Sequence, residues 1–165
     1  MGTLEVIMES SCLRVYSPKY DEETDPEFVR FMLKFRNVTE PQHKKCFDAI
    51  LSAINKMYRD TGARENLFRP EIGSVKAMPL FVHLPKKNKK IGLVRLYCIR
   101  ISDRLLVLGN GDIKRVQTFQ EDPVLYQYVK DLRKIIGKIK RFAAKDNIDF
   151  DDFDRMVELL DSIKI

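Results

Sequence analysis

Apolar residues recur at helical spacing in two adjacent segments of the first third of the chain. The first segment predicts a helix near residues 26–36, because Asp25 and Pro26 are typical of an N-cap followed by the first helical position. The second predicts a helix near residues 41–60 that Gly62 ends. Since only a short break separates them, the two helices are expected to form an αα-hairpin. The apolar positions are Phe28, Phe31, Met32 and Phe35, then Phe47, Ile50, Leu51, Ile54, Met57 and Tyr58.

Elsewhere the pattern has the period of two that is typical of strands. Residues 93–101 and 105–108 alternate well and are joined by a short polar turn, which predicts a β-hairpin. Residues 4–16 predict one strand near the N-terminus. Residues 75–84 contain Pro79 and predict an irregular edge strand.

Two short segments interrupt this part of the chain. The Gly-Asn-Gly sequence at 109–111 predicts a turn or bulge that breaks the second strand of the hairpin, and residues 113–119 are where that strand could resume. The lysine-rich segment 86–90 follows Pro85 and predicts a solvated turn between strands.

The C-terminal part is predicted to be helical. A long helix is expected over residues 122–142, with Thr118 and Asp122 as candidate caps and an interruption at Gly137 that costs roughly 1 kcal/mol. A short acidic helix is expected within residues 146–165, capped by Asp149. The apolar stripe of the long helix comprises Leu125, Tyr128, Val129, Leu132, Ile135, Ile136, Ile139 and Phe142. The other positions carry Lys130, Arg133, Lys134, Lys138, Lys140 and Arg141.

Helices and strands cluster along the chain and do not alternate. This order predicts an α+β fold in which a small antiparallel sheet packs against an N-terminal helical hairpin and C-terminal helices. The length suits one domain over residues 1–165.

The composition indicates a partner of opposite charge. The chain carries a formal net charge of +6 and has a sequence pI of about 9.2. Such a balance attracts nucleic acid, ribosomes or an acidic protein, although ordinary basic proteins also show it. Cys12, Cys46 and Cys98 are far apart in apolar runs, which predicts reduced thiols. With neither a signal peptide nor an apolar run of membrane-spanning length, we expect a cytoplasmic protein without a membrane partner.

Standard catalytic motifs are absent from the sequence. His43 and His83 are forty residues apart, and no cluster of His, Cys and acidic residues has metal-ligand spacing, so we expect no metal site. Neither a phosphate-binding loop, a dinucleotide fingerprint nor a nucleophile elbow is present, and no cofactor is expected.

The strongest candidate chemistry lies on the strand at 93–101. Arg95 and Tyr97 are two residues apart and therefore point from the same face of the sheet. A buried strand rarely carries an unpartnered arginine. One explanation is an ion pair with an acid such as Glu71 or Asp112, and the other is a phosphate-binding surface.

The segment around this strand resembles the RelE/HigB superfamily of toxins from toxin–antitoxin systems, with a RelE-like core at about residues 40–142. The resemblance rests on a helical hairpin, an arginine-bearing strand, a tight hairpin, an aliphatic strand, a glycine with basic residues, and a following helix. The matching residues are Val94–Arg95–Leu96–Tyr97, Ser102–Asp103–Arg104, Leu105 to Leu108, Gly109, Lys114–Arg115 and the helix from Glu121.

The resemblance implies an endoribonuclease that cleaves messenger RNA on the ribosome, with a cognate acidic helix-turn-helix antitoxin as its protein partner. It implies that Arg95 contacts the phosphate and that Lys114 or Arg115 supplies the basic group after the last strand. Many relatives carry a tyrosine, or a histidine near Asp and Tyr, where this chain has Phe119, so Tyr97 or Tyr126 would have to transfer the proton. Further RNA contacts are expected from Arg69, Lys76 and Arg104.

Two other functions fit the same sequence. The chain could have a RelE-like fold without ribonuclease activity, as in a ParE-like topoisomerase inhibitor. Alternatively, it could be a basic module that binds an acidic protein. Growth arrest on expression would separate a toxin from a binding module, and cleaved messenger RNA or a DNA-damage response would separate the two toxin classes.

Overall fold

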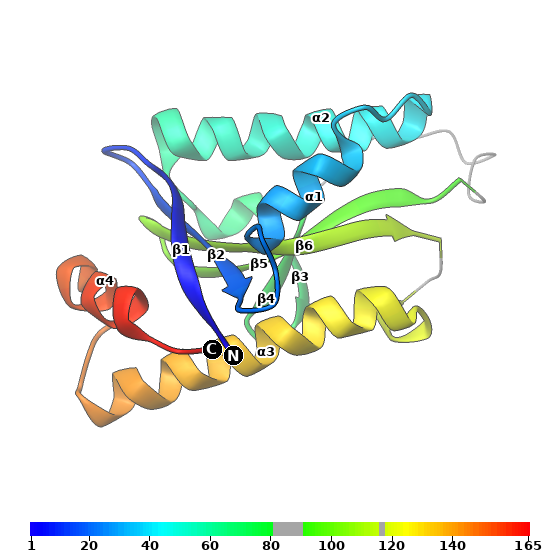
Figure 1. The fold of residues 1–165 in the computed structure, drawn as a ribbon. Helices are drawn as coiled ribbons and strands as arrows, with labels where there is room; N and C mark the ends of the chain where they lie inside the picture. Colours follow the sequence, from blue (N-terminus) through cyan, green and yellow to red (C-terminus); the bar gives the residue numbers. More distant parts are fainter. Residues whose placement is uncertain (81–90, 116–117) are drawn as a thin grey trace.

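A six-stranded sheet lies at the centre of the part of the chain that the structure describes (Figure 1). The computed structural model describes residues 1–80, 91–115 and 118–165. The strands lie in the order β1-β2-β6-β5-β4-β3. Their bounds are Gly2–Glu9 for β1, Arg14–Tyr20 for β2, Arg69–Ile72 for β3, Val75–Met78 for β4, Leu93–Ser102 for β5 and Leu105–Lys114 for β6. With helices on both faces, the predicted α+β class is confirmed.

The sheet is mixed, and the prediction of an antiparallel sheet was wrong in this respect. β2 runs parallel to β6, with Arg14 opposite Leu105 and Tyr16 opposite Val107. All other neighbouring strand pairs are antiparallel. Parallel neighbours need a long crossover connection, and the chain between β2 and β6 provides one that includes two helices.

The N-terminal segment predicted as one strand over residues 4–16 is instead a hairpin of β1 and β2. The side chain of Ser10 closes its turn, because its Oγ accepts hydrogen bonds from the backbone N of Cys12 and of Leu13, both at 3.2 Å. A serine that bonds its own backbone makes a turn without glycine or proline. The apolar pattern runs through this turn, which is why periodicity alone missed it.

The predicted β5–β6 hairpin is confirmed, but residues 109–111 do not break its second strand. Leu96 lies opposite Gly111, and Cys98 lies opposite Leu108. Two residues of β6, at positions 109 and 110, therefore lie opposite the single residue Tyr97 of β5, and the strands form a bulge. The bulge was one of the two predicted alternatives. Gly111 is required here, because a Cβ at this position would collide with the carbonyl oxygen of Arg95.

β4 is an inner strand, whereas residues 75–84 were predicted to form an edge strand. β4 lies between β5 and β3, and β3 is the edge on this side. A further strand outside β4 was difficult to predict, because β3 is only 4 residues long and contains Pro70. The rest of that prediction beyond residue 80, and the predicted turn at 86–90, lie outside the described residues.

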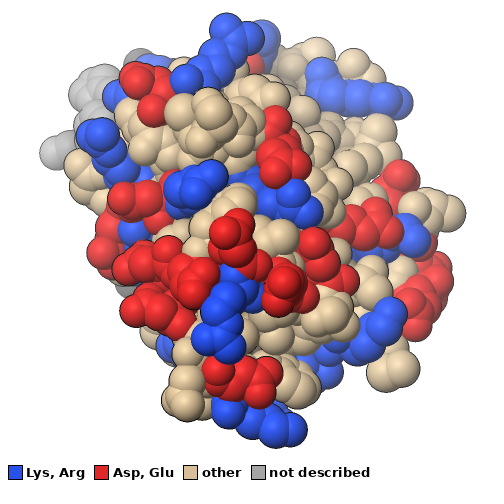
Figure 2. Space-filling model, turned by 90° about the vertical axis from the view of Figure 1, so that its left-hand side faces the viewer, with Lys and Arg blue, Asp and Glu red and all other residues tan. Residues whose placement is uncertain are grey.

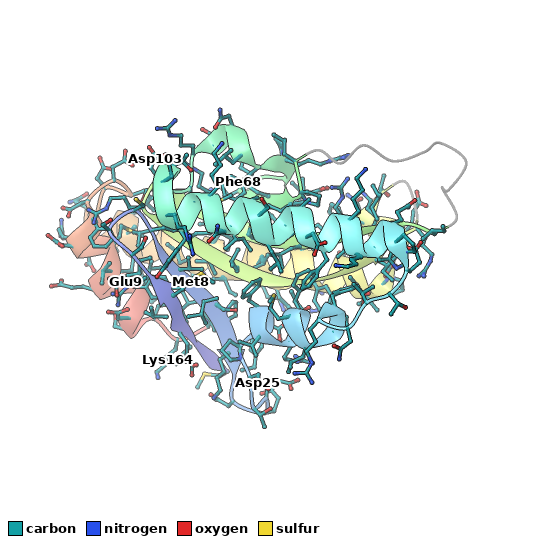
Figure 3. All side chains as sticks on the ribbon, turned by 90° about the horizontal axis from the view of Figure 1, so that it is seen from above. Met8, Glu9, Asp25, Phe68, Asp103 and Lys164 are labelled. Atoms are coloured by element: carbon teal, nitrogen blue, oxygen red, sulfur yellow. The ribbon has the colours of Figure 1, made fainter. Side chains whose placement is uncertain are left out.

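Two helices cover each face of the sheet (Figures 1 and 3). α1 (Glu27–Phe35) and α2 (Pro41–Lys56) cover one face, and a π-helical turn (Met57–Thr61) extends α2 as far as Gly62. α3 (Pro123–Lys145) and α4 (Phe153–Ser162) cover the other face. Short 3-10 turns occupy Glu65–Leu67 and Phe119–Glu121. The four predicted helices are therefore present close to their expected positions.

The helix caps differ in part from the prediction. Asp122 caps α3 as expected, since its side chain accepts hydrogen bonds from the backbone N of Val124 and Leu125. α4 is capped by Asp152, whereas Asp149 was expected; the Asp149 side chain accepts from Asp151 in the preceding turn. α1 begins after Pro26 without a side-chain cap.

The sheet separates two apolar cores, and alternate residues of β5 enter different ones. Tyr97 and Ile99 pack on the α3 face, and Leu96 and Cys98 pack on the α1/α2 face, as the alternation predicted. Helix residues in the α3-side core include Leu125, Val129, Leu132, Ile136, Ile139, Met156 and Leu160; those on the other side include Phe28, Phe31, Phe35, Phe47, Ile50 and Ile54.

Part of β6 is covered by side chains in place of a neighbouring strand, because β2 pairs with β6 only as far as Val107. Ser17 Oγ donates to the carbonyl oxygen of Leu108 at 2.8 Å. Lys34 of α1 donates from Nζ to the carbonyl oxygen of Gly111, also at 2.8 Å. Side chains of β2 and α1 therefore satisfy backbone groups that a strand would otherwise bond.

None of the helices in the described ranges combines the length and apolar character that crossing a membrane requires.

Candidate functional site

The strand register brings three predicted site residues onto one face of the sheet. Arg69 on β3 lies opposite Ala77 on β4, and Ala77 lies opposite Tyr97 on β5. Directly paired residues of antiparallel strands share a face, so Arg69 and Tyr97 point to the side that α3 covers. Arg95 precedes Tyr97 by two residues and points the same way.

Arg95 lies beneath the surface, with 5% of the residue exposed. Its Nη1 donates a hydrogen bond of 2.8 Å to the carbonyl oxygen of Pro79. Burial lowers the pKa of Arg95, and the charge of Arg69 acts in the same direction, whereas Glu71 acts to raise it. Of the two acids considered as ion-pair partners, Glu71 is therefore the one whose charge affects the pKa of Arg95. Asp112 bonds Lys34 at 3.3 Å.

Tyr97 is fully buried beside Phe119, with 6.4 Å between the ring centroids. Burial raises the pKa of its phenol, and the carboxylates of Glu71 and Asp122 raise it further. The hydroxyl is therefore held in its protonated form at neutral pH, as a donor and not as a base.

Three buried polar atoms of this cluster have no hydrogen-bond partner in the structure. They are Arg95 Nε, the Tyr97 hydroxyl and Glu71 Oε1. Glu71 lies next to Arg69, with 3.7 Å between its Oε1 and the arginine Nε. An unsatisfied buried polar atom costs about 1–3 kcal/mol, and such atoms are rare enough in native proteins that a cluster of them marks a candidate site.

Lys114, the last residue of β6, belongs to the same cluster. It is half-buried, and burial lowers the pKa of its ammonium group. Arg69 and Arg95 are near enough to lower that pKa further, while Glu71 and Glu121 counteract them. We define the candidate site as Arg69, Glu71, Arg95, Tyr97 and Lys114.

The other predicted residues lie elsewhere. Arg115 is exposed just beyond the end of β6. Lys76 lies opposite Cys98, on the α1/α2 face, and pairs with Glu65 at 3.8 Å. Arg104 lies over the ring of Phe153 at 3.9 Å.

Arg104 also lies far from the candidate site along the sheet. Its neighbour Asp103 is at the β5–β6 turn, toward one end of the molecule (Figure 3). Arg95 is near the other end of β5, about 25 Å away at the usual rise of a strand.

Sequence reasoning considered Glu71 only as an ion-pair partner and missed its place in the site. The signal that could have found it is the alternation of Arg69 and Glu71 in a short strand next to β4. A bulge between Pro70 and Ile72 adjusts the register there. Tyr126, the other candidate for proton transfer, is exposed and stacks on Phe119 at 6.5 Å.

The described ranges contain no group of three or more His, Cys, Asp or Glu side chains that could hold a metal ion. The chemistry of the candidate site is therefore that of a guanidinium pair, an ammonium, a carboxylate and a phenol. No family model, curated protein or solved structure matches this chain.

Proposed function

We propose that the chain is a toxin of the RelE/HigB type that cleaves messenger RNA on the ribosome. The observation that carries the proposal is the convergence of Arg95, Tyr97 and Lys114 with Arg69 on one face of the sheet. Arginine, lysine and tyrosine are the groups that the resemblance implies, and these four residues come from three strands, β3, β5 and β6. The net charge of +6 supports an anionic substrate.

In this proposal Lys114 and Arg69 contact the phosphate, because they are the more accessible cations of the site. The ribose 2′-oxygen forms a bond to the adjacent phosphorus while the bond to the 5′-oxygen breaks. The 2′-hydroxyl gives its proton to the Glu71 carboxylate, which is the base of the candidate site, and the leaving 5′-oxygen gains a proton that the Lys114 ammonium donates. The cations stabilise the extra negative charge of the crowded phosphate.

Arg95 acts from beneath this surface. Because it is buried and bonded to Pro79, it adds positive potential and positions Lys114 and Tyr97, and it does not contact the substrate in the conformation described. The effect of an uncompensated buried cation on a nearby phosphate is strong because few water molecules screen it.

The test is expression of the wild type, Lys114→Ala and Arg69→Ala in a bacterial host. Removing Lys114 is expected to lower cleavage by about 10²–10³-fold, by analogy with loss of one transition-state donor. Growth arrest, the ends of cleaved translated messages and the melting temperature are measured together. A wild type that neither arrests growth nor cleaves translated RNA contradicts the proposal, as does a folded Lys114→Ala variant that cleaves like the wild type.

A second function is favoured by one observation: Tyr97 and Arg95 are both buried. A toxin without ribonuclease activity, such as a ParE-like topoisomerase inhibitor, needs neither group at the surface. It would arrest growth with a DNA-damage response and leave messages intact. A basic module that binds an acidic protein would leave growth unchanged.

A further inference from the structure

The outward face of α3 carries a group of like charges that the candidate site does not use. The helix lies on the opposite side of the sheet from α1 and α2, with one side facing away from the sheet (Figure 1). Its exposed cations are Lys130, Arg133, Lys134, Lys140, Arg141 and Lys145. None of these six forms a salt bridge with any carboxylate of the described residues, and Lys140 bonds only the hydroxyl of Ser74.

Charges are distributed differently on other parts of the surface. On the side that carries α4 and the tip of the β1–β2 hairpin, basic and acidic side chains are mixed (Figure 2). Several basic residues elsewhere are paired, for example Lys44 with Asp48 and Arg100 with Asp103. Exposed cations without a salt bridge to a described carboxylate also occur near the end of α2, at Lys56 and Arg59, but α3 carries six of them along a single helix.

A second observation points to a close approach at the centre of this face. Gly137 is exposed in the middle of α3, and a Cβ built on it would meet nothing within 4 Å. Glycine destabilises a helix interior, and no packing among the described residues requires it at this position. At 100° per residue, Lys130, Arg133, Lys134, Lys140 and Arg141 lie within about 60° of Gly137 around the helix.

We infer that the outward face of α3 docks the phosphate backbone of structured RNA. The cations span about 22 Å along the helix axis from residue 130 to residue 145. Gly137 leaves a shallow gap between them into which a backbone can settle. The face has no large apolar side chain at its centre, whereas a docked acidic helix would need such an anchor. This inference rests on the proposed function, because ribosomal RNA is the polyanion that the proposed toxin would meet.

The face is distinct from the candidate site, because Arg95 and Tyr97 lie on the inward side of α3, against the sheet. It would therefore contribute affinity and orientation, and not chemistry.

The test compares two triple variants with the same loss of charge. One is Lys130→Gln, Arg133→Gln and Lys134→Gln on α3. The matched control is Lys44→Gln, Lys56→Gln and Arg59→Gln, all exposed in the helical layer on the other face of the sheet. Binding of a fluorescent RNA duplex of mixed sequence is measured by anisotropy over a range of salt concentrations, with a DNA duplex and polyglutamate in parallel.

The α3 triple is expected to reduce the slope of log K against log salt by about 2–3, since each phosphate contact contributes about 0.7–0.9. The control triple is expected to leave that slope near the wild-type value. Gly137→Gln, which changes no charge, is expected to weaken RNA binding while the melting temperature stays at or above that of the wild type. Equal slopes for the two triples would overturn the inference, as would loss of polyglutamate binding alone or preference for the DNA duplex.

The inference and the proposed function can fail separately. If the wild type cleaves translated RNA while both triple variants bind the RNA duplex equally, the inference about α3 is contradicted and the proposed toxin activity is supported. Salt-dependent RNA binding through α3 without any cleavage supports the surface and removes the proposed activity.

Discussion

Two fully buried tyrosines of the sheet differ in whether their hydroxyls have partners. Tyr16 donates a hydrogen bond of 2.8 Å to Asp161 and accepts one of 2.9 Å from Arg14, which links β2 to α4. The Tyr97 hydroxyl has no hydrogen-bond partner among the residues that the structure describes. The hydroxyl of Tyr16 therefore stabilises the fold through hydrogen bonds, whereas that of Tyr97 forms none with the described residues.

The pair gives a matched test. Tyr16→Phe is expected to lower the free energy of unfolding by about 1–3 kcal/mol, because it removes hydrogen bonds to charged groups. Tyr97→Phe is expected to leave it unchanged or raise it by up to about 1 kcal/mol. Urea unfolding of both variants checks this, and ribonuclease activity of folded Tyr97→Phe reports on the proposed role. A large destabilisation by Tyr97→Phe would mean that its hydroxyl has a structural partner.

Arg95 and Glu71 are expected to be coupled, because burial lowers the pKa of the arginine and the carboxylate opposes that change. Arg95→Met should destabilise the fold by about 1–3 kcal/mol, since it removes the donor to the Pro79 carbonyl and a positive charge that acts on Glu71. The double variant with Glu71→Gln should recover part of that loss.

The measurement is a double-mutant cycle by urea unfolding, in which neighbours in one network couple by about 0.5–3 kcal/mol. Strictly additive effects would show that the two side chains act independently.

At the scale of the elements, two glycines in regular structure have opposite requirements. Gly111→Ala in β6 should destabilise strongly, because the added Cβ collides with the backbone oxygen of Arg95. Gly137→Ala in α3 should raise the free energy of unfolding by up to about 1 kcal/mol, because the methyl group enters open space and alanine favours the helix. Thermal unfolding checks both. If Gly137→Ala destabilised the fold, its glycine would have a structural purpose and would no longer point to a ligand.

The long periodic elements could be predicted from the sequence, and the placement of short ones could not. The stripes of α2 and α3 and the alternation of β5 each rest on many apolar positions, so their type and approximate bounds were clear. The turn at Ser10 and the edge strand β3 depend on single hydrogen bonds or on 4 residues, which leave no periodic signal.

The part of the candidate site that lies on a single strand could be predicted from the sequence, whereas the position of the residues on other strands relative to it could not. Arg95 and Tyr97 share a strand, so their common face followed from alternation. Lys114 and Arg69 join them through strand order and register, which depend on how three further strands pair. The burial of Arg95 depends on tertiary packing and could not be foreseen locally.

At the scale of the whole molecule, buried tyrosines link stability to alkaline pH. Burial raises the pKa of Tyr16, Tyr20 and Tyr97 above the ordinary value of about 10. Their raised pKa values favour the protonated phenol in the folded state. Their contribution to the free energy of unfolding is therefore complete below pH 10. It is lost as the pH rises above 10, because the tyrosines of the unfolded chain ionise first and stabilise the unfolded state.

The expected result is a melting temperature that falls steeply above pH 10. The fall should be smaller in Tyr97→Phe, which lacks one of the three groups. Thermal unfolding between pH 8 and about 11.5 measures it. Identical profiles for the wild type and this variant would show that Tyr97 ionises as freely when folded as when unfolded.

The stretch of β6 that β2 leaves uncovered has a consequence for self-association. Gly111 and Leu108 offer carbonyl groups that a strand from another chain could bond, and exposed strand edges of this kind template aggregation. Ser17 and Lys34 already occupy those carbonyls. Another chain can therefore bond these carbonyls only after both side chains have released them, so the contacts of β2 and α1 with β6 oppose strand-by-strand association of separate molecules.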